Sequence, residues 1–232
     1  MRRGLAPSLR GFLKKIIHQF SSIDYTLLIC YHIFIRTHNT KLLSTEDTAI
    51  NILILNLNPD KKDSEFEKYL SEFKESLTHK LHSVEYVVAR DMDIKPCIGC
   101  WNCWAKTPGV CVHQDDMHQI LKHINHNDLM IFAAPFAMGF MHSLAKTVQE
   151  RMIPLLLPYS EIVMGEYHHT LRYETSPELA FLYKPETDTD EEDVQINKDI
   201  FERFSLNFRS NVLFYQSIKK PVTELIHENF DF

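Results

Sequence analysis

Glycine is scarce in this chain. Only 6 of its 232 residues are glycine, and none lies between Gly11 and Gly99. A glycine-rich loop that cradles phosphate with its backbone amides is therefore missing from the first half of the sequence.

Excess positive charge and a long apolar run are also missing. The formal net charge is −6, which argues against nucleic acid as the main partner. The apolar run over residues 25–35 is shorter than the ~20 residues that cross a bilayer, so we expect no membrane span. Four of the five cysteines are clustered and Cys30 stands apart, which is unlike a secreted disulfide framework and favours a reducing, cytoplasmic setting.

The composition changes near residue 48. Basic residues dominate the first 23 positions, and the apolar run follows them. This pattern is compatible with a targeting or membrane-surface segment, but we interpret residues 1–48 as an N-terminal extension that adds little to the fold. One domain is expected over residues 49–232.

Apolar strands alternate with amphipathic helices in that domain. This order predicts an α/β fold, a doubly wound parallel sheet between two layers of helices. We expect the last long helix to bury Ile196, Ile200, Phe204 and Phe208, and the segment Lys219-Lys220-Pro221 to be solvated. The expected strands are 50–57, 84–88, 129–134, 179–183 and 212–215, and the expected helices are 64–77, 115–125, 143–156 and one that starts within 188–193.

Three loops should meet at one edge of such a sheet. Ligands of open α/β sheets bind outside the carboxyl ends of the strands, near the point where the strand order reverses. The loops over residues 57–64, 91–114 and 135–143 follow the first three strands, so we expect them to converge there.

The middle loop carries four cysteines, Cys97, Cys100, Cys103 and Cys111, with the spacing C-x2-C-x2-C-x7-C. A compact run of four thiolates is typical of a [4Fe–4S] cluster. Structural zinc more often uses two separated C-x2-C pairs, and free or redox thiols are the third possibility. His168 and His169 point to opposite faces if they lie in a strand, so we interpret them as a surface loop rather than a metal pair.

The cysteine block and its surroundings resemble a known family. Residues 96–117 read Pro-Cys-Ile-Gly-Cys-x-x-Cys-Trp-x-Lys-Thr-Pro-Gly-x-Cys-Val-x-x-Asp-Asp-Met. With residues 134–139, the Ser143–Arg151 helix and the acidic run 188–193, they resemble the flavodoxin-like NADPH-dependent FMN reductase family, close to its iron–sulfur flavoproteins. The resemblance covers residues from about 50 to 232.

The resemblance implies FMN as cofactor, NAD(P)H as donor, and a homodimer or higher homo-oligomer. It implies that the flavin carries the chemistry, so no side chain is named as catalytic. The FMN phosphate would be held by Asn58, Lys61 and Ser64. The flavin ring would lie against Pro135, Phe136, Ala137, Met138 and Gly139.

The first loop departs from the family pattern. Leu57 stands where the family has glycine, and Asp60 stands where it has arginine. The carboxylates of Asp60, Asp63 and Glu65 would oppose a phosphate dianion there.

Three functions follow from these observations. The first is an FMN-dependent NAD(P)H oxidoreductase that passes electrons to a small acceptor such as a quinone or a flavin. The second is an iron–sulfur flavoprotein that carries electrons on a [4Fe–4S] cluster bound by the four cysteines. The third is a flavodoxin-like interaction module without FMN, which the acidic, glycine-free first loop favours.

Overall fold

The computed structural model describes residues 49–230. The extension expected over residues 1–48, with Cys30, lies outside the described residues.

A mostly parallel sheet with the order β2-β1-β3-β7-β8 forms the centre, and β4 pairs with the end of β3 in the antiparallel sense. The elements are β1 (Asn51–Asn56), α3 (Ser64–His79), β2 (Ser83–Val88), η2 (Ala89–Asp91), α4 (Asn102–Ala105), α5 (Met117–Ile124), β3 (Leu129–Ala137), β4 (Phe140–Met141), α6 (Ser143–Glu150), η3 (Ile153–Leu155), β5 (Leu156–Val163), β6 (Glu166–Leu171), β7 (Glu178–Lys184), α7 (Glu191–Leu206), β8 (Val212–Ser217) and α8 (Val222–Phe230).

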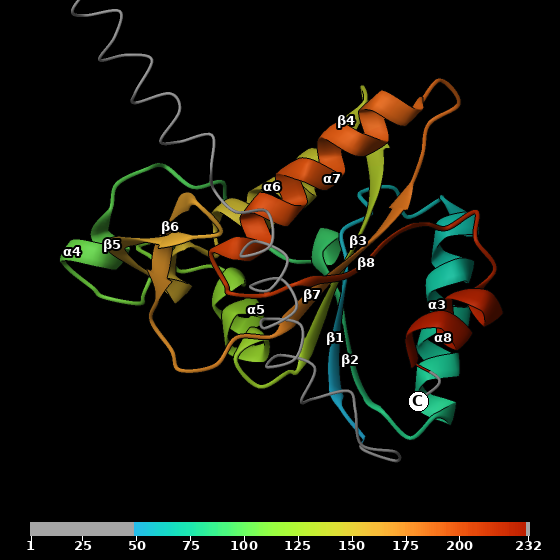
Figure 1. Cartoon of the computed structure of the whole chain (residues 1–232), viewed down its shortest axis with the longest axis horizontal. Helices are drawn as coiled ribbons and strands as arrows, with labels where there is room; N and C mark the ends of the chain where they lie inside the picture. Colours follow the sequence, from blue (N-terminus) through green and yellow to red (C-terminus); the bar gives the residue numbers. More distant parts are fainter. Residues whose placement is uncertain (1–48, 231–232) are drawn as a thin grey trace, which may run out of the picture. The chain divides into compact units, whose positions relative to one another are not determined.

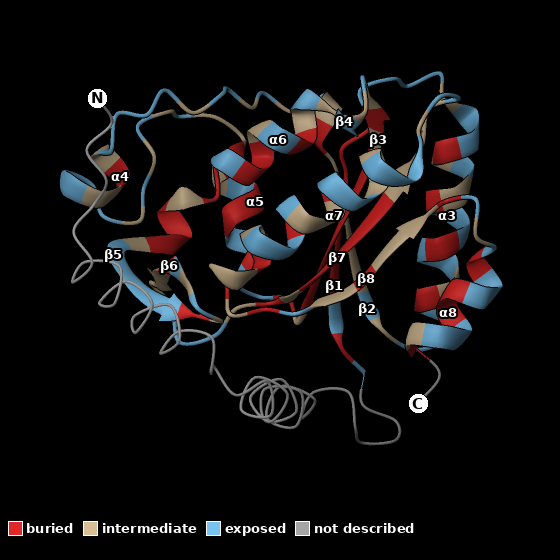
Figure 2. Cartoon of the chain, turned by 45° about the horizontal axis from the view of Figure 1, so that its top comes forward, coloured by how far each residue is buried: buried red, intermediate tan, exposed pale blue. Residues whose placement is uncertain are grey.

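Helices cover both faces of this sheet, which confirms the expected three-layer α/β architecture. Helices α3 and α8 lie on one face, and α5, α6 and α7 lie on the other (Figure 1). The central strands β1 and β3 are buried along almost their whole length, as expected for parallel strands covered on both sides (Figure 2).

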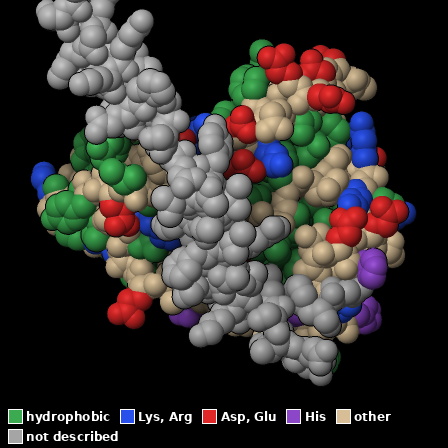
Figure 3. Space-filling view, in the orientation of Figure 1, with side chains coloured by type: hydrophobic (Ala, Val, Ile, Leu, Met, Phe, Trp, Pro, Cys, Tyr) green, Lys and Arg blue, Asp and Glu red, His purple; other side chains and the backbone are tan. Residues whose placement is uncertain are grey.

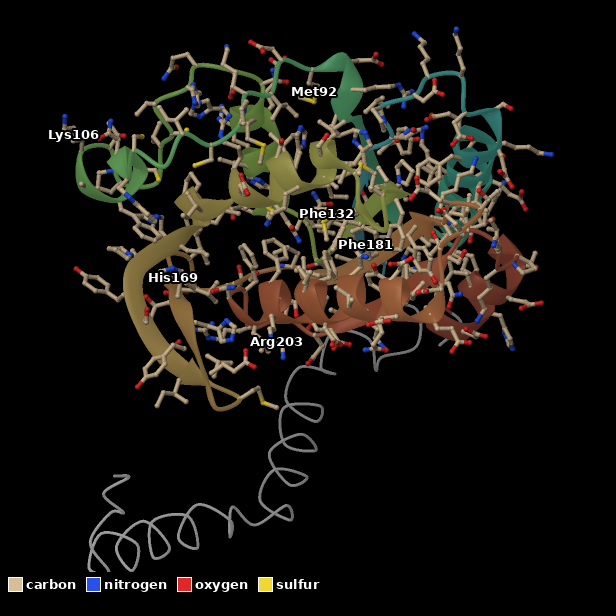
Figure 4. The ribbon with its side chains drawn as sticks, turned by 90° about the horizontal axis from the view of Figure 1, so that it is seen from above. Met92, Lys106, Phe132, His169, Phe181 and Arg203 are labelled. Carbon is tan, nitrogen blue, oxygen red and sulfur yellow. The ribbon has the colours of Figure 1, made fainter. Side chains whose placement is uncertain are left out.

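Aromatic rings fill the space between the sheet and α7. The ring of Phe201 lies edge-on to Phe132 of β3 at 5.4 Å and to Phe181 of β7 at 4.9 Å, measured between ring centroids. Figure 4 shows Phe132 and Phe181 projecting from the sheet toward this helix. All three side chains are fully buried, so this cluster anchors α7 to the sheet.

Removing the central ring of this cluster tests its contribution. We expect Phe201→Ala to lower the free energy of unfolding by about 3–5 kcal/mol, because it leaves a cavity that the rigid sheet cannot close. Urea unfolding followed by circular dichroism measures the change. Ile200→Ala, at the exposed neighbouring position, should cost far less.

The buried face of α7 differs from the expected one in its first half, while Phe208 is buried and Phe204 packs against the core as expected. Asn197, Phe201 and Ser205 are buried, whereas Ile196 and Ile200 are 38% and 41% exposed. The Asn197 side chain accepts a hydrogen bond from Met141 N–H and donates to the Gly139 carbonyl. These bonds turn a polar residue inward, and because neighbouring residues are ~100° apart on a helix, the two isoleucines turn outward.

The chain end holds a helix that the sequence did not predict. Lys219 and Pro221 are exposed as expected, but helix α8 follows them and buries Val222, Leu225, Ile226 and Phe230. The Phe230 ring lies 6.2 Å from Phe73 of α3 and 6.2 Å from Phe214 of β8. Helix α8 has only nine residues and follows two lysines, so its apolar spacing did not predict a helix.

Strands β5 and β6 form a separate two-stranded antiparallel sheet that the sequence did not predict. His168 and His169 lie in β6, so the expected surface loop there is wrong, although their side chains do differ in direction. His168 is buried next to Glu166, and His169 packs on Trp104. Among residues 49–230, no helix is long and apolar enough to cross a bilayer.

Candidate functional site

One cavity brings all four motif cysteines together. Its volume is about 70 Å³, several times the ~10–15 Å³ that a single water needs. Cys103 is buried, Cys97 and Cys111 are half-buried, and Cys100 is exposed, so the cavity opens to solvent at one side. The remaining wall consists of Ile98, Gly99, Trp101, Val112, His113, Arg151, Ile153 and Pro154.

Two left-handed residues turn the chain around Cys100. Gly99 has φ +63°, and Trp101, which caps α4, has φ +58°. This conformation is free for glycine but unusual and costly for a bulky residue such as tryptophan. These two left-handed residues reverse the direction of the chain around Cys100. Cys97, Cys100 and Cys103, which are only three residues apart, therefore line the same cavity.

The cysteine segment is anchored to η3 and β5. The Trp104 ring stacks on Trp101 at 4.9 Å and contacts the tilted His169 ring at 4.8 Å, and its N–H donates to the Leu156 carbonyl at 3.0 Å. Arg172 donates to the carbonyls of Pro154 at 2.8 Å and Cys103 at 3.4 Å. The exposed side chains near α4 lie at one side of the molecule, where Figure 3 shows hydrophobic groups.

A buried ion pair lies at the wall of the cavity, because one of its members, Arg151, lines it. Arg151, at the end of α6, donates to both oxygens of Asp115, at 2.7 and 2.8 Å, and to the Lys95 carbonyl. The two side chains are 1% and 0% exposed. Burial alone would raise the pKa of Asp115, but hydrogen bonds from Arg151 and from backbone amides lower that pKa to about 2. The pair fixes the chain at both ends of the cysteine segment.

Arg151 also faces the thiols. Burial alone would lower the pKa of the guanidinium, but the hydrogen bonds to Asp115 and the negative charges of Cys111 and Asp115 raise it. Burial raises the pKa of the Cys103 thiol, and the charges of Cys111, Cys100 and Cys97 add to this effect. The four sulfurs are therefore close enough to interact, with a cation at the wall of their cavity.

The spacing of the sulfurs bears on what they could hold. Across residues 49–230, no three His, Cys, Asp or Glu side chains are placed around a single metal ion. Tetrahedral zinc, with Zn–S bonds of ~2.3 Å, needs its sulfurs less than ~4 Å apart. A [4Fe–4S] cluster binds each thiolate to a different iron and so holds the sulfurs farther apart. The four cysteines line one cavity, and a [4Fe–4S] cluster needs its four thiolate ligands gathered in this way.

The three residues expected to bind the FMN phosphate differ in burial and in their bonding. Asn58 is buried, and its side-chain amide donates to the Asp60 carbonyl at 2.9 Å and to Glu67 at 3.0 Å. Lys61 and Ser64 are exposed. The Asn58 side chain is therefore used within the loop.

The loop expected to hold the flavin ring is a tight hairpin. Pro135, Phe136 and Ala137 end strand β3, and Met138 and Gly139 form the turn with φ +56° and +78°. Phe136 is buried, with its ring 4.8 Å from that of Tyr183, while Met138 is 92% exposed at the tip. Of the five residues, only Met138 presents a large exposed apolar side chain.

The predicted convergence of three loops is met only in part: the cysteine loop starts beside the first loop, where Arg90 contacts the Asn58 carbonyl at 3.2 Å, but its cysteines lie at η3 and β5. The first loop and the hairpin do meet beside the end of β7, where Lys184 contacts Asp63 at 2.7 Å and Glu186 accepts from Gly139 N–H at 3.2 Å. Figures 1, 2 and 4 all place α4 and α3 at opposite sides of the described residues. Trp104 and Arg172 hold the cysteine segment at η3 and β5, and their partners lie about 50 and 18 residues away in sequence.

Comparisons with known proteins find relatives that match part of the chain. The chain is 32% identical over 75 residues to an iron–sulfur flavoprotein of Methanocaldococcus jannaschii, over 32% of this chain and 38% of that protein. It is 31% identical over 98 residues to an iron–sulfur flavoprotein of Archaeoglobus fulgidus, over 42% and 44% of the two chains. The matches thus span less than half the length of these relatives. No protein-family model matches the chain.

Solved structures resemble the chain over most of its length. A Streptococcus mutans protein, Smu.1420, superposes with a TM-score of 0.53 at 14% identity, over 77% of this chain and 96% of that one. An NAD(P)H:quinone oxidoreductase from Methanothermobacter marburgensis superposes with a TM-score of 0.51 at 16% identity, over 73% and 82%. The fold is flavodoxin-like. These comparisons confirm the resemblance drawn from the cysteine block, and at such identities the solved structures show the fold alone.

Several residues of the site had no distinct signal in the sequence of this flavodoxin-like chain. Asp115 and Arg151 both lie in segments that carry the family resemblance, but nothing in their spacing showed that they pair. Lys184, Trp104 and Arg172 were missed as anchors because their partners are distant in sequence. Only the cysteines, which are close together along the chain, were found as a group.

Proposed function

We propose that this protein is an electron-transfer protein whose redox centre is a [4Fe–4S] cluster bound by Cys97, Cys100, Cys103 and Cys111. The observation that carries the proposal is the shared cavity of the four thiols. When bound, such a cluster takes up and releases single electrons. A single-electron centre suits an exchange with a partner protein rather than hydride uptake from a nicotinamide.

The residues around the cavity have distinct tasks in this proposal. Cys103 supplies a buried ligand and Cys100 an exposed one, so the cluster would lie near the surface, within reach of a partner. Arg151 places a positive charge beside the thiolates, which favours the more negative, reduced state. The stacked rings of Trp101 and Trp104 cover the segment on its outer side.

Analysis of the purified full-length chain tests this function. After anaerobic reconstitution with ferrous iron and sulfide, we expect about four irons per chain and a broad visible absorbance that dithionite bleaches. Less than one iron per chain with no visible absorbance would contradict the proposal. A colourless protein would instead support the interaction module.

A second candidate is an FMN-dependent NAD(P)H oxidoreductase that reduces a quinone, a flavin or a similar small acceptor. The names of the relatives favour it, since two are iron–sulfur flavoproteins and one is an NAD(P)H:quinone oxidoreductase. It requires FMN, and of the residues expected at its phosphate the Asn58 side chain already donates to Asp60 and Glu67, while Lys61 and Ser64 are exposed. Flavin absorbance that NAD(P)H bleaches, without iron, would support this candidate against the first.

A further inference from the structure

We infer that the loop between β1 and α3 excludes the phosphate of FMN, and that the carboxylates of Asp63 and Glu65, bound to Lys184, cause the exclusion. A flavodoxin-like fold binds phosphate there only if the loop amides and the helix N-terminus are free to donate. In this chain three loop amides, and the Phe66 amide at the helix N-terminus, already donate to the chain's own side chains.

The loop amides are used within the loop. Asn58 N–H donates to the side-chain oxygen of Asn56 at 3.0 Å, and Asp60 N–H donates to that of Asn58 at 3.0 Å. Lys62 N–H donates to the Asp60 carboxylate at 2.8 Å, and Pro59 has no N–H to offer. A phosphate would have to displace three side-chain bonds to gain these donors.

The N-terminus of α3 already holds negative charge. Asp63 is the N-cap and accepts from Phe66 N–H at 3.2 Å, which fills the place where a phosphate oxygen would be bound. Lys184 contacts Asp63 at 2.7 Å and Glu65 at 2.9 Å. The lysine that ends β7 therefore neutralises these carboxylates and is not free to meet an anion.

A second cation near the loop is also paired. Arg90 donates to Glu67, in the first turn of α3, at 2.7 Å, and to the Asn58 carbonyl at 3.2 Å. Asn56 donates to the same glutamate at 2.9 Å. The Glu67 carboxylate thus accepts hydrogen bonds from Asn56, Asn58 and Arg90, and these bonds hold the loop against the first turn of α3.

At the β3–β4 hairpin, where the flavin ring would lie, backbone amides are also bonded to the chain's own side chains. Gly139 N–H donates to Glu186 at 3.2 Å, and Met141 N–H donates to Asn197 at 2.9 Å. A Cβ at Gly139 would lie 2.9 Å from the Asp193 carboxylate, so the tip is packed against α7. Figure 3 shows acidic side chains gathered at the end where α7 begins.

Flavin binding to the full-length chain tests the inference. Wild-type protein is titrated with FMN, and with riboflavin as the matched probe without phosphate, and quenching of flavin fluorescence is followed. We expect no binding of either flavin up to on the order of 100 μM. The double variant D63S/E65Q keeps a capping side chain and releases Lys184. It should bind FMN at least about tenfold more tightly than riboflavin.

The control variant E72Q/E75Q removes the same charge from exposed positions farther along α3 and should bind neither flavin. Micromolar binding of FMN to the wild type would overturn the inference. So would a D63S/E65Q variant that melts like the wild type yet gains no preference for FMN. Iron is counted in the same samples, so that the cluster proposal and this inference can fail separately.

Discussion

Replacing Cys103 by serine should remove most of the iron, and with it the visible absorbance, from reconstituted protein. Cys103 is the buried member of the four cysteines, and the other three sulfurs influence its thiol directly. A serine hydroxyl matches the thiol in shape but lacks the soft thiolate that iron–sulfur clusters use. We expect iron to fall by about tenfold, because the remaining three ligands leave one iron open to solvent.

Iron analysis and visible spectroscopy after anaerobic reconstitution measure this effect. Cys30→Ser, which changes the cysteine outside the motif, serves as the control and should retain the full iron content. Circular dichroism and the thermal midpoint of the unreconstituted variants show whether the fold is intact. A correctly folded Cys103→Ser protein with unchanged iron would refute the assignment of this thiol as a ligand.

Replacing Asp115 by asparagine should produce the second large effect. The substitution leaves the Arg151 guanidinium buried without its counter-charge, which costs about 3–5 kcal/mol of unfolding free energy. Urea unfolding at neutral pH measures the loss. Asp93→Asn breaks an exposed pair with Lys95 and serves as the control; it should leave the urea midpoint unchanged.

The same ion pair predicts how stability depends on pH. Burial alone would raise the Asp115 pKa, but its bonds to Arg151 and to backbone amides bring it down to about 2, below the usual value of 3.8. A lowered carboxylate pKa contributes stability that is present above pH ~4 and is lost as the pH falls toward ~2. Wild-type protein should therefore lose stability over this interval, and the Asp115→Asn protein should lose less. Equal slopes for the two proteins would contradict the pairing.

The alternation of strands and helices was predictable because it depends on local patterns. The aliphatic run of β1 and the apolar spacing of α3 are each visible within a few residues, and both elements form as expected. Helix α7 shows the limit of this approach. Its apolar periodicity fits Ile196 and Ile200, but two hydrogen bonds of Asn197 to the β3–β4 hairpin, 56 and 58 residues away, decide which side faces the sheet.

In the candidate site, too, the sequence predicted the features that depend on neighbouring residues and not those that depend on distant contacts. The cysteines were found as a group because all four lie within fifteen residues, so their spacing is itself a signal. Their location was not predictable, because it depends on the bonds of Trp104 and Arg172 to carbonyls near β5. The acidic first loop was recognised as unusual, but only the structure shows Lys184 bridging Asp63 and Glu65 from 119 to 121 residues away.

The sequence by itself determined the α/β architecture and the set of thiols, since both follow from the order and spacing of neighbouring residues. Only the tertiary structure decided that these thiols share a cavity with Arg151, which is paired with the buried Asp115, and that the cysteines lie at η3 and β5. It also decided that the loop is closed by its own carboxylates. Those features depend on contacts between segments distant in the chain, and such contacts form only when the sheet and its helices pack together.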